Sequence, residues 1–307
     1  MTKIFIDGSS GTTGLNIRER LKEYSGIEII SLPPELYKDN LAKAEAINQS
    51  DITILCLPDL SAKESVSLCT NKNTVIIDTS TAHRTLQGWT YGFPELTGNI
   101  ELIKNSKRIA NPGCHASGFI SLIAPLTENG IINKDTVLSC FSLTGYTGGG
   151  KNMIKEYETE EIPLNKAPRL YGLSQSHKHL PEMMKYGGLT NAPAFCPIVA
   201  PFPRGMEVVV TLNKKDLLAT ESDIREVYKN YYTGNIIKYN ENADENGFLS
   251  ASKFANTDQM EISVFGSSEN LILVSRFDNL GKGACGSVIQ NLNIVLGEPQ
   301  EKGLVIK

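Results

Sequence analysis

Cys114 has the surroundings of a nucleophilic thiol. It ends the sequence Asn111–Cys114 (NPGC) and stands just before the apolar stretch Ala116–Leu126, which we expect to form a helix. A thiol at a helix N-terminus meets backbone N–H groups and the positive end of the helix dipole, and both favour the thiolate. We therefore predict that Cys114 is the nucleophile. The other cysteines lie in strand, helix or proline-rich patterns typical of small apolar side chains; they are Cys56, Cys69, Cys140, Cys196 and Cys285.

A histidine pair is the second chemical signal. His177 and His179 lie two positions apart, so in an extended segment both imidazoles would face one cleft. Pro181 suits the first turn of a helix. Glu182, three residues after His179, would orient that imidazole and stabilise its charged form. We therefore assign proton transfer to His179 with Glu182, and substrate binding to His177.

The other histidines carry weaker signals. His115 follows Cys114 directly, and adjacent residues on a helix point apart, so it is not an obvious base for the thiol. His83 has no comparable carboxylate partner and fits a structural role equally well. The His-x-His spacing of 177 and 179 also suits a metal ion, but no third ligand is apparent, and we predict no metal.

A glycine-rich loop, Gly8–Gly14 (GSSGTTG), lies between the apolar segment Lys3–Asp7 and the helical pattern Leu15–Tyr24. Glycines let the backbone approach a dinucleotide phosphate, and N–H groups at the helix start face the anion. The spacing differs from the commoner GxGxxG, and an ordinary glycine-rich turn is the alternative. The residues that we expect to bind the cofactor here are Gly8, Ser10, Gly11, Thr12, Thr13 and Gly14.

The choice between NAD and NADP depends on the end of the second predicted strand. That strand has no terminal acid, and two prolines separate it from Glu35, which lies near the position of an acidic ribose ligand. Ser31 and Lys38 would instead suit a 2′-phosphate. The residues alone leave both cofactors open and favour NADP.

Alternating strands and helices must position these groups in the first third of the chain. Such alternation predicts right-handed βαβ crossovers and a parallel sheet with helices on both faces. The expected strands are Lys3–Asp7, Ile27–Leu32, Ile52–Leu57 and Thr74–Asp78, and the expected helices are Leu15–Tyr24, Leu41–Gln49 and Ser61–Cys69.

After about residue 135 the pattern changes to strands that follow strands, which predicts an antiparallel α+β domain. The expected strands are Val137–Leu143, Glu207–Asn213, Glu261–Phe265 and Leu271–Phe277. A long helix is expected over Thr220–Tyr232, with Thr220 and Asp223 in capping-box spacing. A final helix, about Ala284–Leu296, should end at Gly297.

Composition narrows the class of protein. The 307 residues suggest two domains, and 30 Lys+Arg against 34 Asp+Glu give a net charge of −4, which lacks the basic footprint of a nucleic-acid binder. No apolar stretch approaches a membrane span, and the three apolar residues between Lys3 and Asp7 are too few for the core of a signal peptide. Six cysteines without CxxC spacing suit thiols in a reducing compartment. We therefore expect a cytoplasmic enzyme with a small-molecule substrate and no nucleic-acid or membrane partner.

Nearly the whole chain resembles the shorter variant of the N-acetyl-gamma-glutamyl-phosphate reductases of arginine biosynthesis. Single motifs are modest signals, but their combination and order are specific. Two positions depart from the family pattern: His115-Ala116 replaces an aromatic residue and a proline, and Arg204-Gly205 replaces a more neutral pair. The motifs are GSSGTTG (8–14), LPPE (32–35), CLPD (56–59), DTSTAHR (78–84), GWTYGFPEL (88–96), NPGC (111–114), GYTGGGK (145–151), HKHLPEM (177–183) and NLGKGACGSVIQNLN (279–293).

The resemblance implies a Rossmann-type, doubly wound NADP-binding domain, residues 1–113, completed by the C-terminal helix at about 284–307. It implies an α+β catalytic domain, residues 114–283, of the type found in aspartate-semialdehyde and glyceraldehyde-phosphate dehydrogenases. Gly283 and Asn291 would lie near the nicotinamide. A homodimer or homotetramer is usual for the family.

The resemblance also implies a reaction: reduction of N-acetyl-glutamyl 5-phosphate through a Cys114 thioester. The substrate's phosphate and carboxylate need cationic or N–H partners, and the candidates are Arg84, Asn111, Lys151 and His177. An aspartate-semialdehyde dehydrogenase-like reductase is the nearest alternative. A cofactor-binding sensor would not need the thiol beside the histidine pair, and a cysteine hydrolase would not need the glycine loop.

Overall fold

The computed structural model describes residues 1–267 and 269–307, which form two compact units. Unit 1 comprises Met1–Pro112 and Ala284–Leu304, and unit 2 comprises Gly113–Gly283 and Val305–Lys307. Compared with the boundaries expected from the sequence, Gly113 and the last three residues belong to unit 2. The backbone N–H of Val305 donates to Asp258 in unit 2 (2.8 Å), which accounts for the return of the C-terminus.

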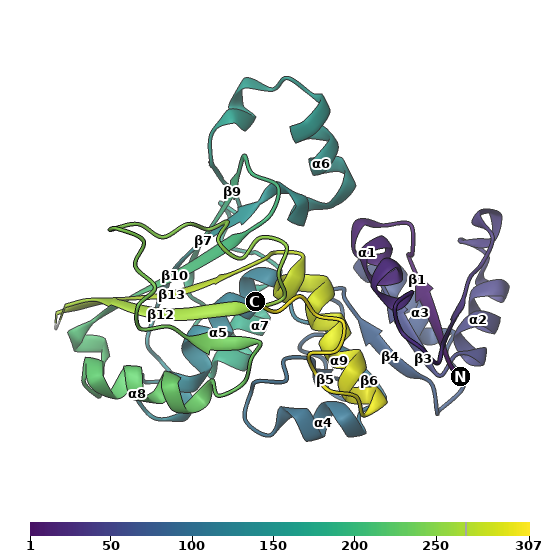
Figure 1. The fold of residues 1–307 in the computed structure, drawn as a ribbon, viewed down its shortest axis with the longest axis horizontal. Coiled ribbons are helices and arrows are strands. Elements are labelled where there is room, and N and C mark those ends of the chain that lie inside the picture. The colour runs from purple at the N-terminus through teal and green to yellow at the C-terminus, as the bar shows by residue number, and fades with distance from the viewer. Residues whose placement is uncertain (268) are drawn as a thin grey trace. The chain divides into compact units, whose positions relative to one another are not determined.

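Unit 1 is a parallel sheet in the order β2-β1-β3-β4-β6-β5, with helices on both faces (Figure 1). The prediction of a doubly wound parallel sheet is confirmed. The strands are β1 (Thr2–Asp7), β2 (Ile27–Ile30), β3 (Ile52–Leu55), β4 (Val75–Asp78), β5 (Thr90–Tyr91) and β6 (Arg108–Ala110). The helices are α1 (Thr12–Leu21), the short η1 (Pro34–Leu36), α2 (Asn40–Gln49), α3 (Asp59–Ser67), α4 (Asn99–Asn105) and α9 (Gly286–Leu296).

The alternation of side chains along β1 shows why both faces of this sheet are covered. Ile4 and Ile6 point into a cluster with residues of α1, α4 and α9, whereas Phe5 packs against Ala46 and Ile47 of α2. Successive strand residues face opposite sides, so an uninterrupted apolar strand needs a helix layer on each side.

The strand order places a topological switch point between β1 and β3, since the chain leaves β1 toward β2 and later crosses back to β3. Ligands of open α/β sheets bind at the carboxyl ends of the strands beside such a point. Gly8 follows β1 there with φ +83°, and a Cβ atom on it would lie 2.3 Å from the carbonyl oxygen of Cys56, just after β3. The glycine loop therefore lies where this fold binds ligands.

Unit 2 is built on a sheet in the order β11-β12-β13-β10-β7-β9-β8. The sequence predicted an antiparallel sheet, and this is wrong in part: β7 pairs with β9, and β11 with β12, in parallel. The strands are β7 (Ser139–Gly145), β8 (Arg169–Leu170), β9 (Ala194–Ala200), β10 (Met206–Asn213), β11 (Ile237–Tyr239), β12 (Met260–Gly266) and β13 (Asn270–Phe277). The helices are α5 (Cys114–Glu128), α6 (Gly150–Thr159), α7 (Leu180–Gly187) and α8 (Glu221–Tyr231).

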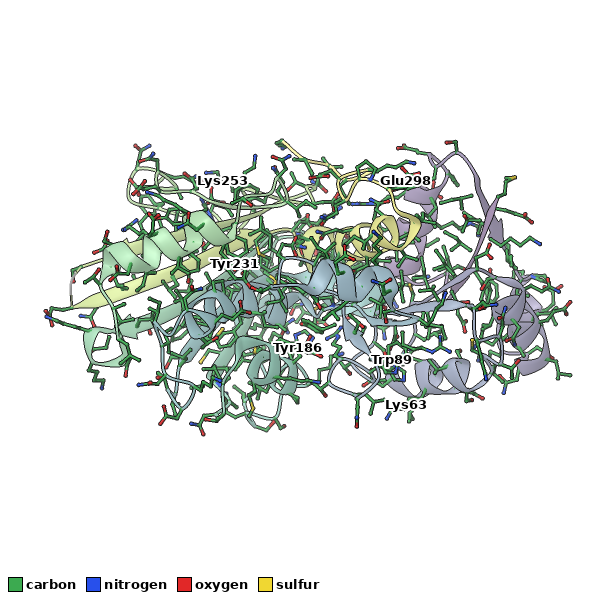
Figure 2. All side chains as sticks on the ribbon, turned by 90° about the horizontal axis from the view of Figure 1, so that it is seen from below. Lys63, Trp89, Tyr186, Tyr231, Lys253 and Glu298 are labelled. Atoms are coloured by element: carbon green, nitrogen blue, oxygen red, sulfur yellow. The ribbon has the colours of Figure 1, made fainter. Side chains whose placement is uncertain are left out.

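Helix α5 is the centre of unit 2. It lies against β10 and β13, and α7 and α8 pack on it (Figure 1). Gly118 permits the close approach, because a Cβ there would lie 2.4 Å from Cγ2 of Val208. The hydroxyl of Tyr228 on α8 donates to the Leu122 carbonyl (2.6 Å), and Tyr231, labelled in Figure 2, donates to Glu128. These contacts hold the helix that begins with the predicted nucleophile.

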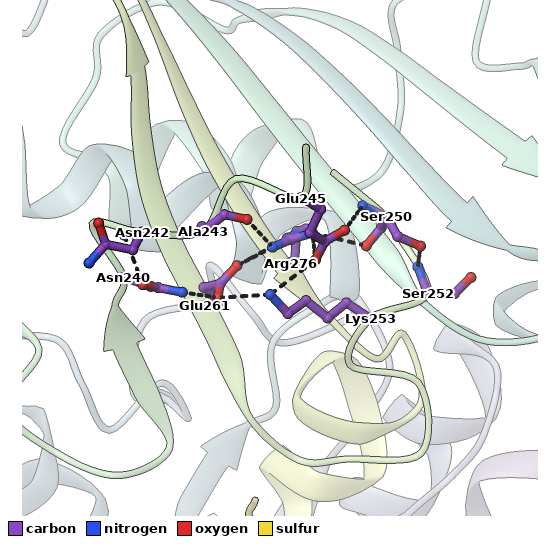
Figure 3. A network of polar contacts seen from close by, with 9 residues as sticks. All are labelled: Asn240, Asn242, Ala243, Glu245, Ser250, Ser252, Lys253, Glu261 and Arg276. Carbon is purple, nitrogen blue, oxygen red and sulfur yellow. Dashed lines mark hydrogen bonds and ion pairs between the residues drawn. The ribbon is translucent and has the colours of Figure 1, made fainter. Parts of the chain in front are cut away.

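The opposite face of the sheet carries a buried ionic network (Figure 3). Arg276 on β13 is fully buried and donates to Glu261 on β12 and to Glu245 in the loop before β12. Lys253 adds ion pairs to both carboxylates, at 3.0 Å to Glu245 and 3.8 Å to Glu261. A buried guanidinium needs such partners, so the network ties the loop of residues 240–253 to the sheet.

Candidate functional site

Cys114 is the first residue of α5, as the sequence predicted, and its side chain is partly exposed. The preceding Gly113 has no side chain to occupy the amides of the first helical turn. Gly283 lies against the thiol residue, because a Cβ atom on Gly283 would stand 3.0 Å from the Cβ of Cys114. The backbone at Gly283 therefore forms one wall of the thiol's surroundings.

The turn that contains Gly283 is held by Asp278. Its carboxylate accepts hydrogen bonds from the amides of Leu280 (2.7 Å) and Gly281 (2.9 Å). The same carboxylate binds the guanidinium of Arg204 in a bidentate pair, at 2.8 and 3.0 Å. Arg204, one of the departures from the family pattern, is therefore neutralised by Asp278 and acts in unit 2 as part of this turn.

Glu182 links α7 to the start of α5. It is buried, and its Oε2 accepts a hydrogen bond from the Gly113 amide (3.2 Å). Its Oε1 lies 4.0 Å from Nε2 of His179, at the outer limit of an ion pair. The carboxylate thus stands between the imidazole and the helix N-terminus that carries the thiol.

His177 and His179 are brought together by a turn and not by the extended segment that we expected. The amide of His179 donates to Nδ1 of His177 (3.2 Å), and the two ring centres are 4.7 Å apart. Because Nδ1 of His177 accepts this hydrogen bond, the neutral ring carries its proton on Nε2. His179 is buried, whereas His177 is half-buried and offers a donor at Nε2.

His115 joins this cluster, which the sequence did not indicate. Its ring centre lies 5.7 Å from that of His177 and 5.6 Å from that of His179. Nδ1 contacts the hydroxyl of Ser142 on β7, and Nε2 contacts the hydroxyl of Tyr171, both at 2.6 Å. Burial, and next the charge of His177, lower the pKa of His115 to about 3. The ring is therefore neutral at physiological pH.

Lys151, a predicted substrate ligand, is exposed on α6. None of the residues of α6 is fully buried, although Met153, Ile154, Glu156 and Tyr157 are half-buried, so one face of this helix packs against unit 2 and the other is exposed. The described structure thus keeps Lys151 in solvent, where its amine can approach a soluble anion.

In unit 1, Gly11 is the N-cap of α1 and has no side chain, so the amides that follow it face outward. The loop borders a cavity of about 510 Å³ that is lined by Gly8, Ser9, Ser10 and the ends of β1 and β2. A cradle of backbone N–H groups beside a cavity of this size fits a dinucleotide phosphate and its adenosine half.

Among the described charged side chains that line this cavity, two cations lack an acidic partner, whereas the acid Glu64 accepts a hydrogen bond from Asn40 (2.8 Å). Arg18, Lys38 and Ser31 line it, and among the described residues neither Arg18 nor Lys38 has an acidic partner. Lys43 also lines it but is paired with buried Asp7 at 3.0 Å. Glu35 lies outside the lining residues and is exposed.

The polar residues at the end of β6 bind one another within unit 1. The side-chain amide of Asn291 on α9 donates to the Gly92 carbonyl (2.9 Å) and to Asn111 (3.1 Å). Arg84 donates to the carbonyls of Asn111 and Thr79, each at 2.9 Å. The buried Oδ1 of Asn291 has no hydrogen-bond partner within residues 1–267 and 269–307. It is an acceptor that suits the carboxamide of a nicotinamide.

His83 has a carboxylate partner, which the sequence did not indicate. Its Nδ1 lies 2.6 Å from Oδ2 of buried Asp78, and its ring stacks on Trp89 (labelled in Figure 2) at 4.1 Å. The partner is five residues away across a turn, a separation that helical or strand periodicity does not reveal.

Family models of known proteins match both a part of the chain within unit 1 and the part that begins at Cys114. The family model described as "Semialdehyde dehydrogenase, NAD binding domain" matches residues 33–105. The family model described as "Semialdehyde dehydrogenase, dimerisation domain" matches residues 114–279 and so begins at Cys114. "N-acetyl-gamma-glutamyl-phosphate reductase 2" of Nostoc sp. is 40% identical, covering 98% of this chain and 99% of that protein. The "N-acetyl-gamma-glutamyl-phosphate reductase" of Brucella anthropi is 43% identical, covering 96% of this chain and 99% of that protein. This chain belongs to the N-acetyl-gamma-glutamyl-phosphate reductase family.

Solved structures support the fold of this reductase family. The aspartate semialdehyde dehydrogenase II of Vibrio cholerae complexed with ASA has a TM-score of 0.72 and 15% identity, covering 97% of this chain and 98% of that one. The aspartate semialdehyde dehydrogenase of Francisella tularensis has a TM-score of 0.72 and 17% identity, covering 96% and 100%. The prediction of a Rossmann-like sheet with a semialdehyde-dehydrogenase-type second domain is confirmed. None of the described helices has the length and apolarity of a membrane span.

Proposed function

We propose that this chain reduces N-acetyl-glutamyl 5-phosphate to N-acetyl-glutamate 5-semialdehyde and phosphate, with NADPH as the reductant, in arginine biosynthesis. The observation that carries the proposal is the thiol of Cys114 at the start of α5, in the same unit as buried His179 and Glu182. Its substrate is drawn from the names of relatives that match nearly the whole chain.

Cys114 acts first in the proposed mechanism. Its thiolate attacks the acyl carbon, the carbon–oxygen bond to the phosphate breaks, and phosphate leaves as a thioester forms on the sulfur. A thiolate suits this step because it is strongly nucleophilic near neutral pH, and a thioester remains reducible. Bound NADPH supplies the hydride that reduces the thioester carbon.

His179 carries the proton in the proposed mechanism. It protonates the oxygen of the thiohemiacetal as that oxygen gains charge, and it takes the proton back when the carbon–sulfur bond breaks and the semialdehyde leaves. Glu182, 4.0 Å from Nε2, stabilises the charged imidazole during this cycle. A positioned acid–base group of this kind contributes roughly 10²–10⁴-fold to the rate.

The substrate's phosphate and carboxylate are assigned to His177, Lys151, Arg84 and Asn111. His177 is the best supported, because its Nε2 is a fixed donor in the neutral ring. Arg84 and Asn111 already bind neighbouring backbone or side-chain groups, so their contribution is to fix backbone carbonyls and amides at the end of β6. Lys151 supplies an exposed positive charge.

The fit of the cofactor rests on groups of unit 1. The amides after Gly11, with Gly8, Ser10, Thr12, Thr13 and Gly14, would hold the pyrophosphate. Ser31, Arg18 and Lys38 at the cavity favour the 2′-phosphate of NADP over the bare ribose of NAD. The unpartnered Oδ1 of Asn291 would serve the nicotinamide end.

We further propose a cytoplasmic homodimer or homotetramer. All six cysteines are thiols, which suits a reducing compartment. Large apolar side chains are exposed on the segment between α6 and α7, at Leu164 (75%), Leu170 (51%) and Leu173 (75%), which suits burial against another copy. Light scattering of the parent and of Leu164→Glu/Leu173→Glu checks this: the parent elutes as an oligomer, and the variant as a smaller species. A parent monomer contradicts it.

The activity test follows absorbance at the nicotinamide band in the reverse direction, with N-acetyl-glutamate 5-semialdehyde, phosphate and NADP⁺. Cys114→Ser should abolish the signal, whereas Cys196→Ser should retain it. Aspartate semialdehyde is the matched competitor substrate. A higher kcat/KM for aspartate semialdehyde, or full turnover by enzyme alkylated stoichiometrically at Cys114, would refute the proposal.

A further inference from the structure

A buried ion pair lies in the wall of the unit 1 cavity, where the strand that leads into the glycine loop ends. Asp7 is the last residue of β1, and its Oδ2 lies 3.0 Å from Nζ of Lys43 on α2. Ser65 on α3 donates to the same Oδ2 (2.7 Å), and Nζ of Lys43 donates to Ser65 (3.3 Å). Asp7 and Lys43 are 5% and 6% exposed, and both line the cavity of about 510 Å³. The pair therefore offers polar atoms to a molecule bound there.

The hydrogen bonds within this pair leave one acceptor and one donor unused. An ionised carboxylate has two acceptor oxygens, and both side-chain contacts of Asp7 within residues 1–267 and 269–307 are made by Oδ2, so Oδ1 accepts none. Lys43 has three N–H donors, of which two serve Asp7 and Ser65. Buried polar atoms without partners cost free energy, so a ligand that supplies both partners gains affinity.

The charge of this pair does not suit a phosphate. Asp7 carries a negative charge that Lys43 already neutralises, so the pair as a whole offers an anion no net attraction. Arg18 and Lys38, which line the same cavity and have no acidic partner among the described residues, attract the phosphates instead. The Lys43–Asp7 pair suits a neutral group that carries a donor beside an acceptor.

The rest of the lining indicates what kind of neutral group this is. Ile30, Leu32 and Leu57 line the same cavity and provide apolar surface for a planar ring. Adenine is such a ring, and its exocyclic amine is a donor that stands beside ring nitrogens that accept. Hypoxanthine has a carbonyl oxygen in place of the amine, so it would present an acceptor to the carboxylate.

We propose that the Lys43–Asp7 pair recognises the adenine ring of the cofactor. Oδ1 of Asp7 accepts a hydrogen bond from the exocyclic amine, and Nζ of Lys43 donates to the ring nitrogen beside that amine. Ser65 is a positioning residue, since its hydroxyl holds Oδ2 and leaves Oδ1 for the base. This inference rests on the proposed function for the presence of a dinucleotide in the cavity, and it adds the residues that select the base.

The test compares two affinities of the full chain, measured by titration of nicotinamide fluorescence without substrate. One is for NADPH, and the other is for its analogue with hypoxanthine in place of adenine. The parent should bind NADPH at least about tenfold more tightly, as expected when a charged group loses a hydrogen-bond partner. In Asp7→Leu/Lys43→Met the ratio should fall to about one, because neither base then finds these polar partners. Replacing both members avoids the buried unpaired charge that a single replacement would leave.

Glu64→Gln is the matched control. Glu64 on α3 is an acid that lines the same cavity, but its carboxylate accepts a hydrogen bond from Asn40 (2.8 Å). The ratio of the two affinities in Glu64→Gln should equal that of the parent. A ratio lost in this variant would assign the base to Glu64 and overturn the inference.

Equal affinity of the parent for the two cofactors, or an unchanged ratio in the double variant, would also overturn the inference while leaving the proposed function standing. A ribose hydroxyl bound at Asp7 in place of the base gives that equal affinity. If the double variant does not fold, Ser65→Ala decides: its ratio should be lower than that of the parent, and an unchanged ratio contradicts the role of the pair. A parent that binds neither cofactor refutes the proposed cofactor and this inference with it.

Discussion

Replacing Gly8 by alanine should damage cofactor binding for a reason that can be separated from backbone strain. Gly8 has φ +83°, and its new Cβ would lie 2.3 Å from the oxygen and 2.9 Å from the carbon of the Cys56 carbonyl. These are backbone atoms of the adjoining strand end and cannot rotate away, so the loop itself must move. Gly26 has nearly the same φ, +84°, but nothing lies within 4 Å of its Cβ position.

The two substitutions therefore share one free-energy cost and differ in another. Gly26→Ala should lower the free energy of unfolding by roughly 1–2 kcal/mol, the cost of a left-handed conformation for a residue with a Cβ. Gly8→Ala bears the same strain and the clash as well, so we expect a larger loss, on the order of 3 kcal/mol or more, or a displaced loop. A displaced loop no longer presents its amides to a phosphate.

The assays are urea unfolding and titration of NADPH fluorescence. We expect Gly8→Ala to weaken NADPH binding at least tenfold and Gly26→Ala to bind like the parent, while both retain the pH-dependent alkylation of Cys114 in unit 2. Equal affinity of the two variants for NADPH would refute the placement of the phosphate at this loop. Equal stability would refute the steric argument.

Three further outcomes are expected. His179→Gln should lower kcat by roughly 10²–10⁴-fold with little change in KM, whereas His177→Gln should raise KM at least as much as it lowers kcat; steady-state kinetics decides, and the opposite pattern exchanges the two roles. Lys38→Gln should reduce the ratio of kcat/KM for NADPH over NADH by about tenfold, and an unchanged ratio places the 2′-phosphate elsewhere. The lowered pKa of His115, about 3, means that the unfolded chain gains a proton below pH 6.5 and the folded chain does not. Stability is thus lost as pH falls from about 6.5 toward 3, at up to about 1.4 kcal/mol per pH unit from this group, and His115→Phe should flatten that loss in urea unfolding measured across pH.

Local sequence patterns were sufficient to predict much of unit 1 and helix α8 of unit 2. β1 and the helix after it follow from an apolar run that ends at Gly8, and α8 begins with the Thr220–Asp223 capping box that its spacing indicated. The same logic missed β9, whose interior contains Pro197 and which is paired with β7 across a long crossover. Strand pairing between distant segments is set by tertiary packing and not by the residues of either strand alone. The mixed sheet was therefore not predictable from the hydrophobic periodicity of the sequence.

The candidate site shows the same difference between local signals and long-range contacts. Cys114 could be proposed from sequence because a helix start is a local feature, and Glu182 because it follows His179 in sequence. The contact between Tyr171 and His115 was missed because the two residues are 56 positions apart and meet only after β7 and β9 have paired. Residues whose chemistry depends on such long-range contacts carry no signature in their own segment.

The three imidazoles explain why one histidine can be the proton carrier in this cluster. Two charged rings 4.7 Å apart would repel by about 3.5 kcal/mol at an effective dielectric constant of 20, so the cluster holds one proton at a time. His115 is excluded by burial between two hydroxyls, and His177 is disfavoured because its Nδ1 accepts the amide of His179. His179 has the Glu182 carboxylate at 4.0 Å, so the charge is most stable there. In the proposed mechanism the neutral rings thereby restrict proton exchange to His179, whose partner Glu182 also accepts a hydrogen bond from the Gly113 amide at the start of α5.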